Sequence, residues 1–142
     1  MNSQIVALLV ILGVSLGQKT PSISSITPHQ IKDAKESVDL QCSVLNLSDF
    51  PVIWKKKSQS GGIILSSGEY LIDRDSRYDI LYDKSSSTFT LKIKDLEESD
   101  AGTYQCQILL SAVYQITAEV ELQVRRASDK YSHNPTQSSE SE

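Results

Sequence analysis

The stretch Asp100-Ala101-Gly102-Thr103-Tyr104-Gln105-Cys106 decides how this sequence folds. It ends in one of only two cysteines; the other, Cys42, lies 64 residues earlier. The only tryptophan, Trp54, stands between the two cysteines and close to the first. Gly102 suits a tight bend that a side chain would obstruct. Because neither cysteine is left over, we expect one disulfide between them.

Apolar and polar residues alternate on both sides of this stretch, which is the period of a half-buried strand. The clearest runs are 38–44, 89–93 and 116–124, and turn residues such as Ser60-Gly61-Gly62 separate the runs. No long stretch after residue 17 has helical spacing, although one short helical turn fits 96–100. The pattern predicts about nine short strands between Thr20 and Arg126, in antiparallel sheets with one wet face each.

The cysteines, the tryptophan and the tyrosine together predict an all-β, variable-type immunoglobulin Greek-key sandwich. Two extra strands, expected near 63–65 and 70–72, mark the variable type, and the stretch 18–31 reads as a first strand that switches between sheets. In such a fold the bridge Cys42–Cys106 joins the two sheets and Trp54 packs against it. The Tyr104 hydroxyl reaches back to the backbone of the preceding corner, and Asp100 pairs with Arg77 as a structural clasp.

The two ends of the chain differ in composition from the centre. Residues 2–17 carry no charge and contain an apolar run at 5–12, so we expect a signal peptide at 1–17. A membrane anchor is the alternative, but spanning a bilayer takes about 20 apolar residues. Export would favour the disulfide. Residues 18–126 are expected to form the immunoglobulin domain, and the polar, serine-rich residues 127–142 a disordered tail.

Charge and motif content argue against several function classes. The formal net charge is −4, which gives no basic footprint for nucleic acid. There is no glycine-rich phosphate loop, no nucleophile motif beside His29 and no cluster of metal ligands. The acidic pair Asp73 and Asp75 reads as solvated turn residues rather than a calcium site. We therefore expect a protein that is not an enzyme and that uses no cofactor, metal or small-molecule substrate.

Three stretches are more particular than the general immunoglobulin pattern: Thr20-Pro21-Ser22-Ile23-Ser24, Gln30-Ile31-Lys32-Asp33 and Ser76-Arg77-Tyr78. Over about residues 18–126, the chain resembles the first immunoglobulin domain of lachesin-like proteins, insect neural cell-surface proteins related to the IgLON and Dpr/DIP groups. The resemblance implies cell adhesion or recognition, by binding other immunoglobulin-domain proteins or a second copy. It implies a location that is secreted or on the outer face of the plasma membrane.

Two other roles stay open. Lachesin-like proteins carry three immunoglobulin domains and a lipid anchor. The alternatives to adhesion are therefore a secreted, soluble decoy or immune recognition protein, and a structural fragment of a longer, anchored protein with three such domains.

The resemblance also implies which surface binds, namely the sheet that contains the tryptophan strand, its extra neighbours and the last two strands. The partner-binding residues we expect there are Ile53, Lys55, Ile63, Ile64, Gln105, Gln107, Leu109 and Val113. So many apolar residues on one surface favour a protein contact. The alternative is that half of them turn inward, because the alternation breaks at Ile63-Ile64-Leu65 and Leu109-Leu110.

A separate motif predicts a modification. Asn46-Leu47-Ser48 is an acceptor sequence for N-glycosylation, and it lies between strands on an expected exposed loop. Asn134-Pro135-Thr136 has proline in the middle position, which the motif forbids.

Overall fold

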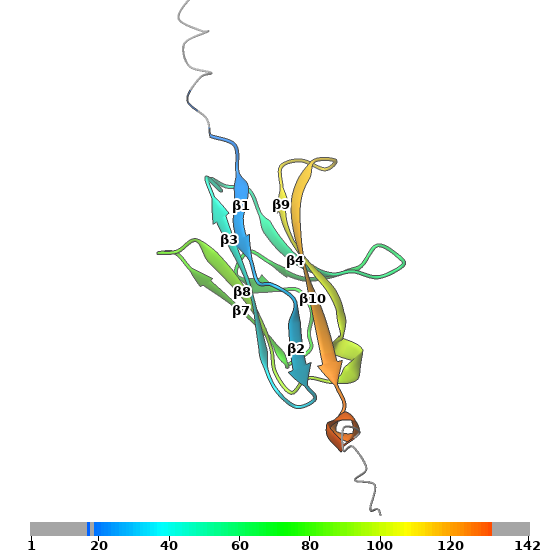
Figure 1. The fold of residues 1–142 in the computed structure, drawn as a ribbon. Coiled ribbons are helices and arrows are strands. Elements are labelled where there is room, and N and C mark those ends of the chain that lie inside the picture. Colours follow the sequence, from blue (N-terminus) through cyan, green and yellow to red (C-terminus); the bar gives the residue numbers. More distant parts are fainter. Residues whose placement is uncertain (1–16, 18, 132–142) are drawn as a thin grey trace, which may run out of the picture.

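Ten strands in two layers form the part of the chain that the computed structural model describes, Gly17 and residues 19–131 (Figure 1). One sheet has the order β1 (Ser22–Ile26), β3 (Val38–Leu45), β8 (Thr88–Ile93) and β7 (Tyr78–Asp83). The other has the order β2 (Gln30–Asp33), β10 (Gln115–Arg125), β9 (Gly102–Leu109), β4 (Val52–Lys56), β5 (Ile63–Ser67) and β6 (Tyr70–Leu71). Two short 3-10 helices follow β8 and β10, η1 (Glu98–Asp100) and η2 (Ala127–Tyr131). The predicted two-sheet sandwich is confirmed, with ten strands rather than nine.

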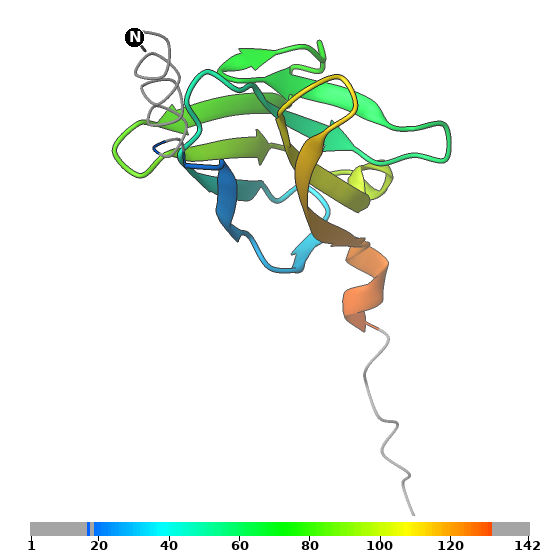
Figure 2. The ribbon, with the colours of Figure 1, turned by 90° about the horizontal axis from the view of Figure 1, so that it is seen from above.

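The first part of the domain belongs to both sheets. β1 pairs antiparallel with β3 in one sheet, and β2 pairs parallel with the end of β10 in the other. Thr27, Pro28 and His29 lie between them, and the Thr27 backbone amide donates to the Gln41 carbonyl before the chain crosses over. The predicted switch between sheets is therefore confirmed, and Figure 2 shows β1 and β2 bridging the layers at one side of the sandwich.

The disulfide sits in the centre of the core. Cys42 of β3 is bonded to Cys106 of β9, with their Cα atoms 6.4 Å apart, and both are fully buried. Trp54 and Tyr104 are among the largest fully buried side chains of the same core. Closing a loop of this length stabilises a fold by about 4 kcal/mol in the chain-entropy model. The predicted bridge is confirmed.

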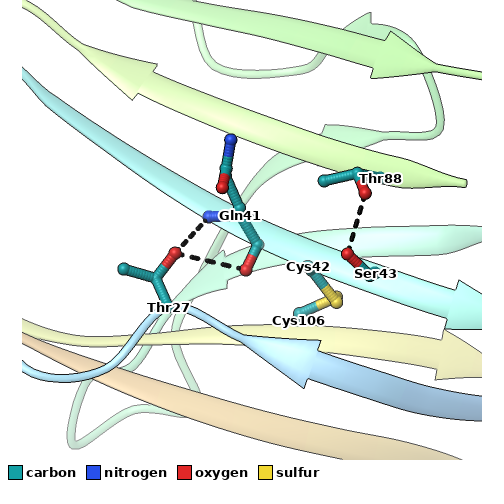
Figure 3. The surroundings of a disulfide bond; sticks show 6 residues. All are labelled: Thr27, Gln41, Cys42, Ser43, Thr88 and Cys106. Carbon is teal, nitrogen blue, oxygen red and sulfur yellow. Dashed lines mark hydrogen bonds between the residues drawn. A yellow bond between two sulfur atoms is a disulfide. The ribbon is translucent and has the colours of Figure 1, made fainter. Parts of the chain in front are cut away.

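Polar side chains on the outer side of β3 tie the disulfide-bearing strand to its neighbours (Figure 3). The backbone N–H of Gln41 donates to the Thr27 hydroxyl at 2.7 Å, and the Ser43 and Thr88 hydroxyls are 2.8 Å apart. These contacts lie just outside the apolar layer, so they secure both edges of β3 without placing polar atoms in the core.

A β-bulge explains why the alternation breaks near Ile63-Ile64-Leu65. In the β4–β5 pair the register shifts between Trp54 and Lys55, so that Ser66 lies opposite Trp54 and Ile64 opposite Lys55. The extra residue, Leu65, is buried. A bulge of this kind re-aims the side chains that follow it, and here it turns Ile64 to the outer face.

The described part of the chain ends in a short 3-10 helix after β10. β10 ends at Arg125, and a 3-10 helix occupies 127–131, where the sequence pattern predicts a disordered tail. Hydrogen bonds close this turn: the Asp129 amide donates to the Arg126 carbonyl, and the Asp129 carboxylate accepts from the Arg126 amide. Residues 1–16 of the expected leader (1–17), Gln18 and the rest of the tail (132–142) lie outside the described residues. Within the described part, no helix has the length and apolar character needed to cross a membrane.

Candidate binding face

The outer face of the six-stranded sheet is defined by the strand register. Ile53 lies opposite Gln107 on one side and Ser67 on the other, and Lys55 lies opposite Gln105 and Ile64. Directly opposed residues point to the same side of a sheet, and Trp54, between them, points into the core. The residues that share the outer face are Ile53, Lys55, Ile64, Ser67, Tyr70, Gln105, Gln107, Leu109, Gln115, Thr117 and Glu119.

Two of the expected partner-binding residues are not available on this face. Ile53 and Gln107 are each only 6% exposed. Their direction agrees with the alternation, but they lie opposite each other on β4 and β9, the two middle strands of the six-stranded sheet. The expectation that Ile53 is a surface residue is therefore wrong. An acidic substitution there would bury an unpaired charge rather than probe a surface.

Exposed apolar side chains gather toward one edge of the face and at one end of it. Ile64 of β5 is 48% exposed and Tyr70 of β6 is 77% exposed. Ile63 is exposed at the start of β5, and Val113 and Tyr114 are exposed in the β9–β10 hairpin. Leu109 is partly buried on the face, while Leu110 packs against the core. The alternation breaks at Leu109-Leu110 because Leu110 turns inward, as the alternative in the sequence analysis allows. Ile64, in contrast, stays on the outer face.

A row of polar contacts lies beside the apolar group. Gln107 Nε2 donates to Gln105 Oε1 at 3.4 Å, and Gln105 Nε2 donates to Glu119 Oε1 at 2.7 Å. Lys57 Nζ reaches the same Glu119 oxygen at 3.4 Å. The hydrogen bond from Gln105, together with the Lys57 charge, lowers the pKa of Glu119 below its ordinary value. The face therefore combines an apolar edge with an ordered polar half.

The clasp around Asp100 lies away from this face and is structural. Arg77 Nη1 and Nη2 donate to the two Asp100 oxygens at 2.6 and 2.9 Å, and the Tyr104 hydroxyl donates to the Asp100 carbonyl at 2.7 Å. The hydrogen bonds that Arg77 donates to the carboxylates of Asp100 and Asp75 raise the pKa of Arg77, and burial raises the pKa of Tyr104. Lys56 Nζ lies 5.6 Å above the Tyr104 ring, and burial lowers the pKa of Lys56.

The acidic pair Asp73 and Asp75 caps the turn that leads into the clasp. Asp73 Oδ1 accepts from the Asp75 amide at 2.8 Å, and Asp75 accepts from the backbone and side chain of Arg77. Hydrogen bonds from Arg77 lower the pKa of Asp75. In the described part of the chain, no group of three or more His, Cys, Asp and Glu side chains is placed to hold a metal ion.

Five residues of the face were not among the expected partner-binding residues: Ser67, Tyr70, Gln115, Thr117 and Glu119. Of these, Tyr70 supplies exposed apolar surface and Glu119 takes part in the row of polar contacts. Tyr70 was missed because Ser66-Ser67-Gly68 reads as a turn, although Ser66 and Ser67 end β5 and pair with β6. Glu119 alternates outward in the sequence, but only the hairpin register, which places it opposite Gln105, shows that it belongs to this face. A register count from the β9–β10 hairpin would have found Glu119.

Comparison with known proteins agrees with this geometry. The family model for the immunoglobulin V-set domain matches residues 30–125. Lachesin of Schistocerca americana is 50% identical over 116 residues, covering 80% of this chain and 33% of the relative. Lachesin of Drosophila melanogaster is 44% identical over 131 residues, covering 92% of this chain and 36% of the relative. The chain thus spans about a third of the length of these curated relatives.

Among solved structures, a chain of the crystal structure of Dpr1 IG1 bound to DIP-eta IG1 is similar, with a TM-score of 0.65 and 28% identity. The match covers 75% of this chain and 96% of that one. The resemblance to lachesin-like and Dpr/DIP domains that the sequence stretches indicated is confirmed. The protein therefore belongs to the immunoglobulin V-set domain family, with lachesin homologues among its relatives.

Proposed function

We propose that this domain serves in cell-surface recognition by docking the outer face of its six-stranded sheet against another immunoglobulin domain. The observation that carries the proposal is the exposed apolar side chains of Ile64 and Tyr70 on that face, with Val113 and Tyr114 exposed in the β9–β10 hairpin at one end of the same sheet. Exposed apolar groups that lie together on one surface mark contact sites. The similar chain in the Dpr1–DIP-eta structure comes from a complex of two such domains.

The layout of the face suits a reversible contact between folded proteins. Protein interfaces combine an apolar centre with a polar rim that stays wet. Here Ile64 and Tyr70 supply apolar area, and Gln105, Glu119 and Lys57 supply ordered polar atoms beside it. The Gln105–Glu119 hydrogen bond already holds two of these side chains in place, which reduces the ordering cost of binding. No chemistry and no cofactor enters this mechanism.

The partner class is another V-set immunoglobulin domain, either a second copy of this chain or a related protein. We place the protein in the extracellular space or on the outer cell surface, in agreement with its disulfide, since such bonds persist in oxidising compartments.

A binding assay with matched variants tests the proposal. The full chain is displayed and probed with itself and with a panel of soluble V-set domains, and sedimentation measures self-association. Ile64→Asp is compared with Leu81→Asp; Leu81 is 54% exposed and faces outward on the opposite sheet, opposite Thr90. We expect Ile64→Asp to weaken binding at least tenfold and Leu81→Asp to leave it unchanged.

Three outcomes contradict the proposal. The first is a folded chain that neither self-associates nor binds any V-set domain. The second is binding that survives Ile64→Asp, and the third is binding that Leu81→Asp abolishes. Circular dichroism of each variant controls for folding.

A further inference from the structure

The turn between β3 and β4 presents two polar side chains to solvent. Asn46 and Ser48 are both exposed. Neither side chain makes a hydrogen bond with any other residue that the structure describes, although both have oxygen or nitrogen atoms able to do so. Leu47, between them, packs against the core and fixes the turn.

Backbone conformation accounts for one of these residues and not for the other. Asn46 has φ +53°, a left-handed conformation in which asparagine is several-fold enriched. Ser48 has φ +51°, where serine has no such advantage. Ser48 supplies the hydroxyl residue that the glycosylation motif requires two positions after an exposed asparagine.

The surface beside Asn46 has room for a sugar. An open hollow of about 460 Å³ is lined by Gly17, Lys19, Asn46, Ser48 and Phe50. The Phe50 ring is 36% exposed there, and Leu45 is 53% exposed next to the turn. A polar cover over this apolar surface would reduce its contact with water. The expected cleavage before Gln18 would remove Gly17 and widen the hollow.

We propose that Asn46 carries an N-linked glycan whose first sugar seats in this hollow against the Phe50 ring. The glycan projects from the end of the sandwich where β3 stops and the β9–β10 hairpin turns (Figure 1). Leu109 of β9 donates to the Pro51 carbonyl, so the two loops are neighbours at this end. The glycan thus caps one end of the domain and leaves the middle of the outer face open. This inference does not depend on what the face binds.

The first experiment tests the site. The full chain is expressed in insect secretory cells, in parallel behind its own first residues and behind an unrelated secretory leader. Secreted protein is treated with a glycan-releasing amidase, and peptide mass spectrometry looks for conversion of Asn46 to Asp. Asn46→Gln and Ser48→Ala should each abolish the glycan mass, whereas Asn134→Gln should leave it unchanged. Secreted protein without a glycan on Asn46 would overturn the proposal.

The second experiment tests the seat against Phe50. Melting temperatures are compared for four proteins: the wild type, Ser48→Ala, Phe50→Ala and the double variant. Ser48→Ala removes the glycan but keeps Asn46, so each background, with and without the Phe50 ring, gives the effect of losing the glycan. The same four proteins made without glycosylation give the effect of the substitutions alone. We expect loss of the glycan to lower Tm when Phe50 is present and not when it is absent. An equal fall in both backgrounds would show that the sugar does not rest on this ring.

Discussion

The two carboxylates that hold Arg77 offer a matched pair for testing how burial sets the strength of the clasp. Asp100 and Asp75 both accept hydrogen bonds from the same guanidinium group, at 2.6–2.9 Å and at 2.9–3.3 Å. Their side chains differ in exposure, 4% for Asp100 and 34% for Asp75. The same substitution, aspartate to asparagine, can therefore be made at a buried and at a partly exposed carboxylate that bind the same arginine.

Asp100→Asn should destabilise the domain strongly. Asp100 Oδ2 accepts from Arg77 and from the Glu97 amide, and Oδ1 accepts from Arg77 as well. An amide replaces one of these oxygens by an NH₂ group, which then faces a donor, and Arg77 loses its best-buried counter-charge. Breaking a buried pair in this way costs about 3–5 kcal/mol. Asp75→Asn keeps an oxygen for the turn and loses an exposed pair, which costs about 0–1 kcal/mol.

Equilibrium unfolding in urea, with the disulfide intact, measures both effects on the full chain. A single domain of this size has about 5–15 kcal/mol of stability, so Asp100→Asn should remove a large fraction of it and shift the midpoint with the m-value unchanged. Equal losses from the two variants would refute the argument from burial. A loss below about 1 kcal/mol for Asp100→Asn would refute it too.

Three further predictions concern the clasp and the disulfide. Tyr104→Phe removes the hydroxyl that donates to the Asp100 carbonyl, and should cost about 1–2 kcal/mol in urea unfolding. Replacing Cys42 and Cys106 together by alanine should cost about 4 kcal/mol, and a loss below 1 kcal/mol would contradict it. Hydrogen bonds from Arg77 lower the pKa of Asp75 in the folded state. The contribution of Asp75 to the free energy of unfolding is therefore complete above its unfolded pKa of about 3.9, and it is lost as pH falls through the pKa of the folded state. When the free energy of unfolding is measured at decreasing pH, it should fall less steeply for Asp75→Asn than for the wild type.

The sequence predicted the direction of side chains better than their exposure. Alternation placed Trp54 inward and Ile53 outward, and both directions are correct because a strand has a fixed period of two. It could not show that Ile53 is covered. That depends on β5 and β9, which the chain reaches only later and whose register against β4 local sequence does not encode.

Strand register, which local sequence does not encode, also limits what could be predicted of the binding face. The disulfide and the Arg77–Asp100 pair could be assigned because they follow a spacing that many such sandwiches share. The exposure of Ile64 depends instead on a one-residue bulge opposite Trp54, which has no sequence signal of its own. Likewise, the short helix at 127–131 rests on a local turn around Asp129 rather than on any helical period.

Site-directed photo-cross-linking tests most directly whether the outer face is the binding surface. A photoreactive phenylalanine replaces Tyr70, which is 77% exposed on that face, or Leu81, which is exposed on the opposite sheet. Each full-length protein is irradiated with its V-set partner or with a second copy, and the cross-linked peptides are identified by mass spectrometry. We predict cross-links to the partner from position 70 and none from position 81. Cross-links from position 81 with none from position 70 would contradict the proposed binding face.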